Sequence, residues 1–77
     1  MIRKLNEGLI IETDTAGMFV PTILFTDIRN KIINNMTSFK LMFLSFSVDK
    51  ENNSISISDD VETITIELSE LTPWFEM

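Results

Sequence analysis

The chain has 77 residues, a formal net charge of −6 at pH 7, and no His, Cys or Tyr. Those absences remove the side chains most often used for acid–base, nucleophilic and metal chemistry near neutral pH, and they exclude a disulfide-stapled scaffold. The hydrophobic fraction of 44%, which includes six Phe and one Trp, is sufficient for a hydrophobic core, so a wholly disordered chain is also excluded. We expect one small domain, residues 1–77, that functions by binding.

The first predicted element is a β-hairpin with strands at Leu9–Glu12 and Met18–Val20. The connecting residues end in Gly17, which tolerates positive φ. Pro21 follows the second strand directly, and it either ends an edge strand or begins a helix, because proline is favoured at the first helical position.

A single helix is predicted from about Asp27 to Asn35, in preference to a longer one that begins near Thr22. Thr26 or Asp27 can cap its first turn, and the Asn34–Asn35 pair is a suitable stop. Apolar residues recur at helical spacing, as on the buried face of a helix: Ile28, Ile32, Ile33 and Met36.

Residues 38–68 alternate apolar and polar side chains, which predicts a three-stranded antiparallel meander. The first strand runs without interruption from Ser38 to Val48, the second is Ser54–Ser58, and the third ends at Leu68. The polar turn residues between them include Asp59 and Asp60. The predicted fold is therefore α+β in the order β-β-α-β-β-β, an antiparallel sheet of hairpin plus meander with one helix packed on one face.

The first meander strand presents a packing problem, because Phe39–Val48 is apolar on both faces and one helix covers only one face of a sheet. The N-terminal hairpin, the Trp74–Phe75 pair or another chain must cover the second face. Pro73 ends the strand pattern, so residues 69–77 form either a flexible tail or a docking segment. Trp74 and Phe75 accordingly belong either to the chain's own core or to a partner-binding surface.

Acidic residues concentrate in the C-terminal part of the chain. Residues 49–77 contain eight acids and one base, a net charge of −7, whereas residues 1–48 contain four acids and five bases, a net charge of +1. The acids Asp59, Asp60 and Glu62, with Glu67 and Glu70 further on, form either a solvated face or a recognition surface for a basic protein partner. Carboxylates that imitate a nucleic-acid backbone are a special form of that surface, and direct nucleic-acid binding is disfavoured by the charge.

The segment from Asp49 to Asp60 faintly resembles a calcium-binding loop, with oxygen-bearing side chains at Asp49, Glu51 and Asn53. Ser54 stands where that loop needs glycine, and Asp60 stands where it needs a bidentate glutamate. We therefore predict no metal and no cofactor. No activated nucleophile or acid–base pair can be named either, so we predict no catalytic residue and no enzyme.

The longest apolar stretch, Met18–Phe25, is interrupted by Pro21 and is far below the roughly 18 residues that a membrane span needs. The N-terminal residues lack the apolar run of a secretory signal. We expect a cytoplasmic protein without a membrane partner.

The leading hypothesis is a small acidic inhibitor or accessory protein, of the immunity, antidote or anti-defence kind, which occupies a basic surface on a protein partner. The expected contact residues are Asp59, Asp60, Glu62, Glu67, Trp74 and Phe75. The alternative is an assembly subunit, in which the second apolar strand face and the C-terminal aromatic pair hold a homo-oligomer together.

Overall fold

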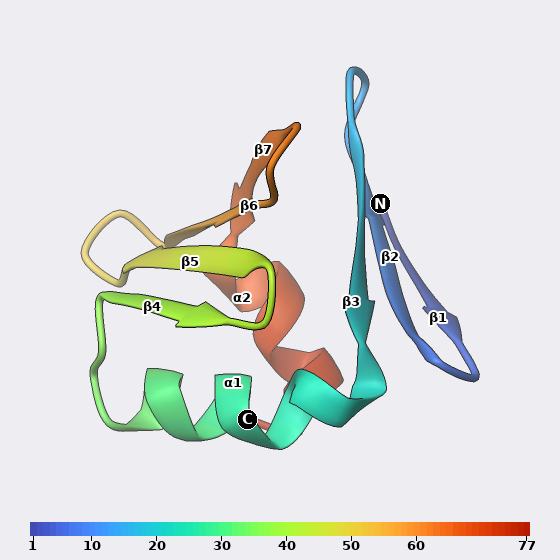
Figure 1. The fold of residues 1–77 in the computed structure, drawn as a ribbon. Coiled ribbons are helices and arrows are strands. Elements are labelled where there is room, and N and C mark those ends of the chain that lie inside the picture. The colour runs from blue at the N-terminus through green and yellow to red at the C-terminus, as the bar shows by residue number, and fades with distance from the viewer.

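The computed structural model describes all of residues 1–77 and contains two antiparallel sheets with helical segments packed against them (Figure 1). The predicted α+β class is confirmed, with two sheets in place of the single sheet expected. Sheet A has the order β1-β2-β3, with bounds Ile2–Leu5, Gly8–Glu12 and Gly17–Pro21. Sheet B has the order β4-β5-β6-β7, with bounds Ser38–Leu41, Leu44–Asp49, Ser54–Ser58 and Thr63–Glu67.

The predicted N-terminal hairpin is present as β2 and β3, and β1 adds a strand that the sequence did not predict. Inward-facing residues pair across the hairpin, as in Leu9 with Val20. Gly8 is buried because the ring of Phe19 lies across it: an added Cβ would clash with the carbonyl oxygen of Val20 and would lie 2.8 Å from Cε1 of Phe19. This close approach explains why glycine begins β2.

The helical region begins immediately after Pro21, which ends edge strand β3 in an extended conformation. A 3₁₀ turn, η1 (Thr22–Leu24), continues directly into α1 (Phe25–Ile33). Helical structure therefore starts near Thr22, earlier than the preferred prediction. Thr26 and Asp27, the predicted caps, lie inside the helix for that reason. The predicted stop is confirmed, since Asn34 is the C-cap and Asn35 has a φ of 61°.

The predicted strand from Ser38 to Val48 is two strands, because the chain reverses at Met42 and Phe43. Met42 has a φ of 56°, the positive value at the first central position that a tight two-residue hairpin turn requires. Phe39 then pairs with Phe46, and their rings stack with centroids 4.8 Å apart. The meander consequently has four strands.

This reversal removes the expected second apolar face. A two-residue turn shifts the alternation, so that Phe39 before the turn and Leu44, Phe46 and Val48 after it all face the core. The opposite face of sheet B is lined by hydroxyls in cross-strand rows, and the hydroxyls of Ser56 and Thr65 lie 2.8 Å apart. Two of these rows run Ser38, Ser47, Ser56, Thr65 and Lys40, Ser45, Ser58, Thr63. A polar face of this kind needs no apolar cover.

The C-terminal segment forms a short helix, α2 (Leu68–Leu71), followed by a 3₁₀ turn, η2 (Thr72–Phe75). Its apolar residues Leu68, Leu71 and Phe75 are buried in the core. The first turn of α2 is held by Asn53 from the β5–β6 loop. The Asn53 side-chain Oδ1 accepts the Ser69 N–H at 3.0 Å, and its carbonyl oxygen accepts the Leu68 N–H at 3.0 Å.

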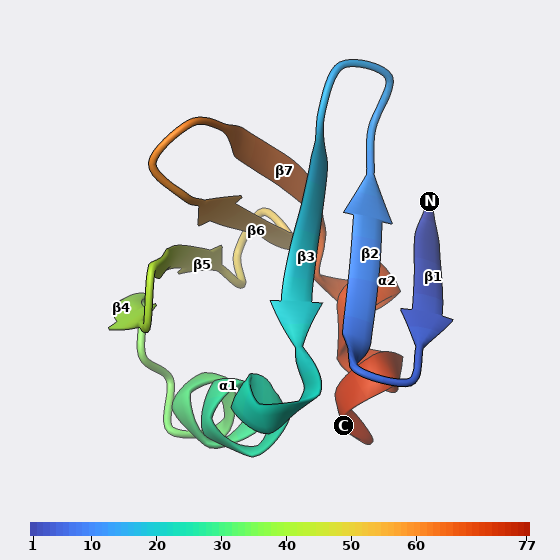
Figure 2. The ribbon, with the colours of Figure 1, turned by 45° about the vertical axis from the view of Figure 1, so that its right-hand side comes forward.

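One hydrophobic core joins all of these elements. It contains 17 buried apolar residues from both sheets and the helical segments, and no polar or charged residue is buried. Figures 1 and 2 show sheet A standing beside sheet B, with α1 at one end of the sheets. The C-terminal segment leads from the end of β7 back to α1, where Phe75 packs on Phe25. The two sheets therefore depend on each other for burial. No helix has the length and apolar character needed to cross a membrane.

Candidate functional site

The residues predicted to bind a partner do not form one cluster. Asp59, Asp60 and Glu62 lie in the β6–β7 turn, whereas Glu67 is at the far end of β7, about 16 Å from Glu62 for a strand that rises about 3.3 Å per residue. Trp74 lies in η2. The structure thus divides the predicted surface among a turn, a strand end and a helical turn.

Two acids of the β6–β7 turn are engaged within the protein. Oδ1 of Asp59 accepts the backbone N–H groups of Glu62 at 2.7 Å and Val61 at 2.8 Å, and these hydrogen bonds lower the pKa of the Asp59 carboxyl. Oε2 of Glu62 accepts the Gly17 N–H at 3.2 Å and so links this turn to the start of β3. Asp60 is exposed. Reversing the charge of all three would therefore disturb the turn as well as the surface.

Glu67 instead belongs to a groove of about 540 Å³ between the β2–β3 hairpin and the β7–α2 connection. Four carboxylates line it, from Glu12, Asp14, Glu67 and Glu70. We call this the acidic groove. Glu12 ends β2 and Asp14 lies in the following loop, while Glu67 ends β7 and Glu70 is in the first turn of α2. The remaining lining residues are Met1, Thr13, Thr65 and Ile66.

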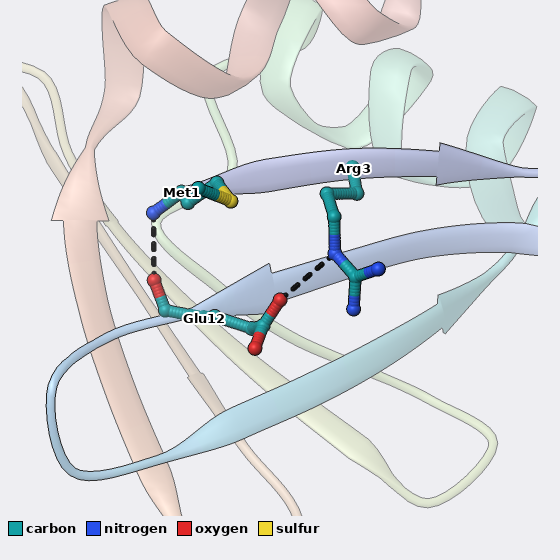
Figure 3. Close-up of polar contacts among 3 residues, drawn as sticks. All are labelled: Met1, Arg3 and Glu12. Atoms are coloured by element: carbon teal, nitrogen blue, oxygen red, sulfur yellow. Dashed lines mark hydrogen bonds and ion pairs between the residues drawn. The ribbon is translucent and has the colours of Figure 1, made fainter.

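One carboxylate of the acidic groove has an ion-pair partner. Arg3 Nε lies 2.9 Å from Oε1 of Glu12, and the Met1 ammonium donates to the Glu12 carbonyl oxygen at 2.7 Å (Figure 3). The Arg3–Glu12 pair is the only salt bridge in the molecule, so Asp14, Glu67 and Glu70 keep unpaired charges. The charge of Arg3 offsets that of Glu12, so the negative potential of the groove arises from Asp14, Glu67 and Glu70.

Sequence reasoning missed Glu12 and Asp14 as members of this site. They are more than 50 positions from Glu67 in the chain, and only the packing of the hairpin beside β7 brings them close. Neither residue lies in a run of charged residues that would have pointed to a site. The short spacing from Glu67 to Glu70, by contrast, was visible in the sequence.

The aromatic pair at the C-terminus separates into one core residue and one surface residue. Phe75 is 3% exposed, and its ring packs edge-on against Phe25 with centroids 5.1 Å apart. Trp74 is 38% exposed and lines a second groove, of about 420 Å³, together with Arg29 from α1. Of the pair, only Trp74 presents surface to a binding partner.

The acidic groove can attract cations, but its carboxylates do not converge on one point. No group of three or more Asp or Glu side chains is placed to hold a metal ion. Comparison with family models, curated proteins and solved structures finds no match to this chain. The chemistry of its surface is thus the basis for a functional assignment.

Proposed function

We propose that this chain is a protein-binding module whose acidic groove receives a basic segment of a partner protein. By occupying that segment, the module acts as an inhibitor or accessory protein. The observation that carries the proposal is that four acidic residues line one groove, of which only Glu12 is ion-paired. Charge complementarity of this kind accelerates encounter and selects for basic partners.

The groove also offers more than charge. Ile66, which also lines it, is half-buried, and Thr13 and Thr65 are among the lining residues. A lysine or arginine side chain carries an aliphatic stem and a cationic head, so it matches a surface that combines an apolar side chain with carboxylates. This combination favours a basic peptide segment over a free small cation.

The assembly alternative has lost one of the two observations that motivated it, since the second face of sheet B is lined by hydroxyls rather than apolar side chains. The acidic groove and the exposed part of Trp74 remain as contact surfaces. We therefore favour binding to another protein over self-assembly.

The proposal is tested with a synthetic peptide of alternating lysine and serine, titrated into isotope-labelled protein and followed by NMR. We expect saturable shifts of the amide resonances of residues 12–14 and 65–70, and no such shifts with a glutamine–serine peptide. The variant Asp14→Asn/Glu67→Gln/Glu70→Gln should bind about tenfold more weakly, because each exposed ion pair contributes about 0.2–1 kcal/mol.

A matched control variant is Glu7→Gln/Asp27→Asn/Glu51→Gln. It changes the net charge by the same amount at three exposed acids outside the groove. Binding should be weakened much less than in the groove variant. If both variants lose the same affinity, the peptide responds only to net charge and the assignment of the acidic groove fails.

A further inference from the structure

The second groove, which we call the Arg29 groove, lies between the η1–α1 segment and η2. Thr22, Thr26 and Arg29 line one side of it. Successive intervals of four and three residues place these side chains on one face of the helical segment, so two hydroxyls and a guanidinium converge on the same space. Trp74 lines the groove from η2.

Arg29 lacks the partners that a partly buried guanidinium normally has. It forms no ion pair with a carboxylate, and its Nε is buried without a hydrogen-bond acceptor in the protein. A buried donor without an acceptor is unfavourable, and more so when the group is charged. Nε itself is closed off from solvent, so an anion in the groove would engage the guanidinium through its terminal Nη groups and balance a charge that no carboxylate of the protein pairs.

The aromatic side chains supply the apolar part of the site. Trp74 is partly exposed on a turn that the buried Phe75 anchors. Phe25, which also lines the groove, has the ammonium group of Lys4 5.3 Å from its ring centroid, so a second cation lies near the site. The groove therefore combines aromatic lining residues with the guanidinium of Arg29, in a chain whose net charge is −6.

These features determine the class of ligand. A carboxylate matches the planar fork of a guanidinium with two parallel hydrogen bonds. The protein's net negative charge, and Glu76 on the lining of the groove, disfavour a doubly charged phosphate more than a singly charged carboxylate. We propose that the Arg29 groove binds a small monocarboxylate, with its carboxylate on Arg29 and an aromatic or branched apolar body against Trp74.

The site is independent of the acidic groove and can be tested directly with benzoate. The chain contains two arginines, Arg3 and Arg29, so NMR can follow the side-chain Nε–Hε resonance of Arg29 with that of Arg3 as an internal reference. We expect benzoate to shift the Arg29 resonance saturably, together with the indole resonance of Trp74. Benzamide, which is neutral, and inorganic phosphate should each bind at least about tenfold more weakly.

Two substitutions should act in opposite directions. Arg29→Gln should weaken benzoate binding about tenfold or more, through loss of a charge-assisted bidentate contact. Glu76→Gln should strengthen binding about two- to fivefold, because it removes a repulsive charge at an exposed position. Lys31→Gln is the control, since it removes one positive charge from the same helix outside the groove and should have little effect.

The proposal is overturned if benzamide binds as well as benzoate, if Glu76→Gln weakens binding, or if Arg29→Gln and Lys31→Gln behave alike. Absence of a saturable shift in the wild-type protein overturns it as well. Should Arg29→Gln fail to fold, Glu76→Gln and the comparison of the three probes still decide the outcome.

Discussion

The acidic groove and the Arg29 groove differ in how their charged groups are supported. The four acidic residues of the acidic groove lie at exposed positions at strand and turn ends, and three of them have no ion-pair partner. The Arg29 groove is built on core residues, since Phe25 and Phe75 form part of it and Phe75 is buried. The first groove can therefore be altered without unfolding the protein, whereas the second is coupled to the stability of the fold.

The largest expected effect comes from removing the anchor of the Arg29 groove. Phe75→Ala should destabilise the protein by about 3–5 kcal/mol, a typical loss for a buried phenylalanine. That is a large part of the stability of a domain of this size, which is about 4–12 kcal/mol at the usual value per residue. Urea denaturation followed by circular dichroism measures the change, and Phe75→Leu provides a milder step if the alanine variant is unfolded.

Trp74→Ala is the matched comparison, since Trp74 is adjacent in sequence but 38% exposed. Its loss of stability should be clearly smaller than that of Phe75→Ala. Equal losses would mean that both aromatic residues serve the core, and Trp74 would no longer qualify as a binding surface.

Asn53 affects both grooves, because it holds the first turn of α2. Glu70 of the acidic groove lies in that turn, and η2, which lines the Arg29 groove, follows it. Asn53→Ala removes the bonds to Ser69 and places alanine at a φ of 52°. We expect a loss of about 1–2 kcal/mol, as for other helix caps, measured by urea denaturation. Asn53→Gly relieves the strain at positive φ but lacks the side-chain bonds, so it should recover only part of the loss. Full recovery would show that the backbone conformation, and not the cap, is what matters.

Local sequence signals predicted the elements whose turns have recognisable chemistry. The β2–β3 hairpin, the helix stop at Asn34–Asn35 and the Asp59–Asp60 turn were all found from residue types that favour turns. The acidic residues of the β6–β7 turn could be identified from the sequence for the same reason. Gly17 does not have the positive φ for which it was singled out, and the Thr13 hydroxyl instead holds the β2–β3 loop by accepting the Ala16 N–H. What the pattern did not reveal was that Asp59 and Glu62 are engaged within the protein.

The β4–β5 turn had no such signal, because Leu41–Leu44 contains no Gly, Pro, Asn or Asp. Met42 adopts a conformation that costs about 1–2 kcal/mol for a residue other than glycine. The stacked pair Phe39–Phe46 and the burial of Leu44 offset that cost, and both depend on the completed core. Tertiary packing decided this turn, so local propensity could not have predicted it.

The remaining differences also arise from contacts distant in sequence. β1 is short and carries Arg3 and Lys4, and it becomes a strand by pairing with β2. The helical turn of α2 is too short to form alone and depends on Asn53. The acidic groove likewise exists only when the hairpin lies beside β7.

The smallest expected effect concerns Asp59, whose turn holds Glu62 against Gly17 and so fixes the hairpin beside β7. Hydrogen bonds from the Glu62 and Val61 N–H groups lower the pKa of Asp59 in the folded protein below its ordinary value of 3.8. The charged form therefore adds stability above that ordinary pKa, and this contribution is lost as the pH falls through the folded-state pKa. Asp59→Asn imitates the protonated carboxyl.

The variant should consequently be less stable than the wild type near neutral pH, and the difference should shrink at acidic pH, as the pH falls below the ordinary pKa of 3.8 towards the lower folded-state pKa. Urea denaturation at both pH values measures this. Asp49, whose pKa is also lowered, by its hydrogen bonds to Asn52, is unchanged in both proteins and cancels from the comparison. A stability difference that stays constant with pH would show that Asp59 acts through the geometry of its turn rather than through its charge. In that case the alignment of the hairpin with β7 would not depend on ionisation.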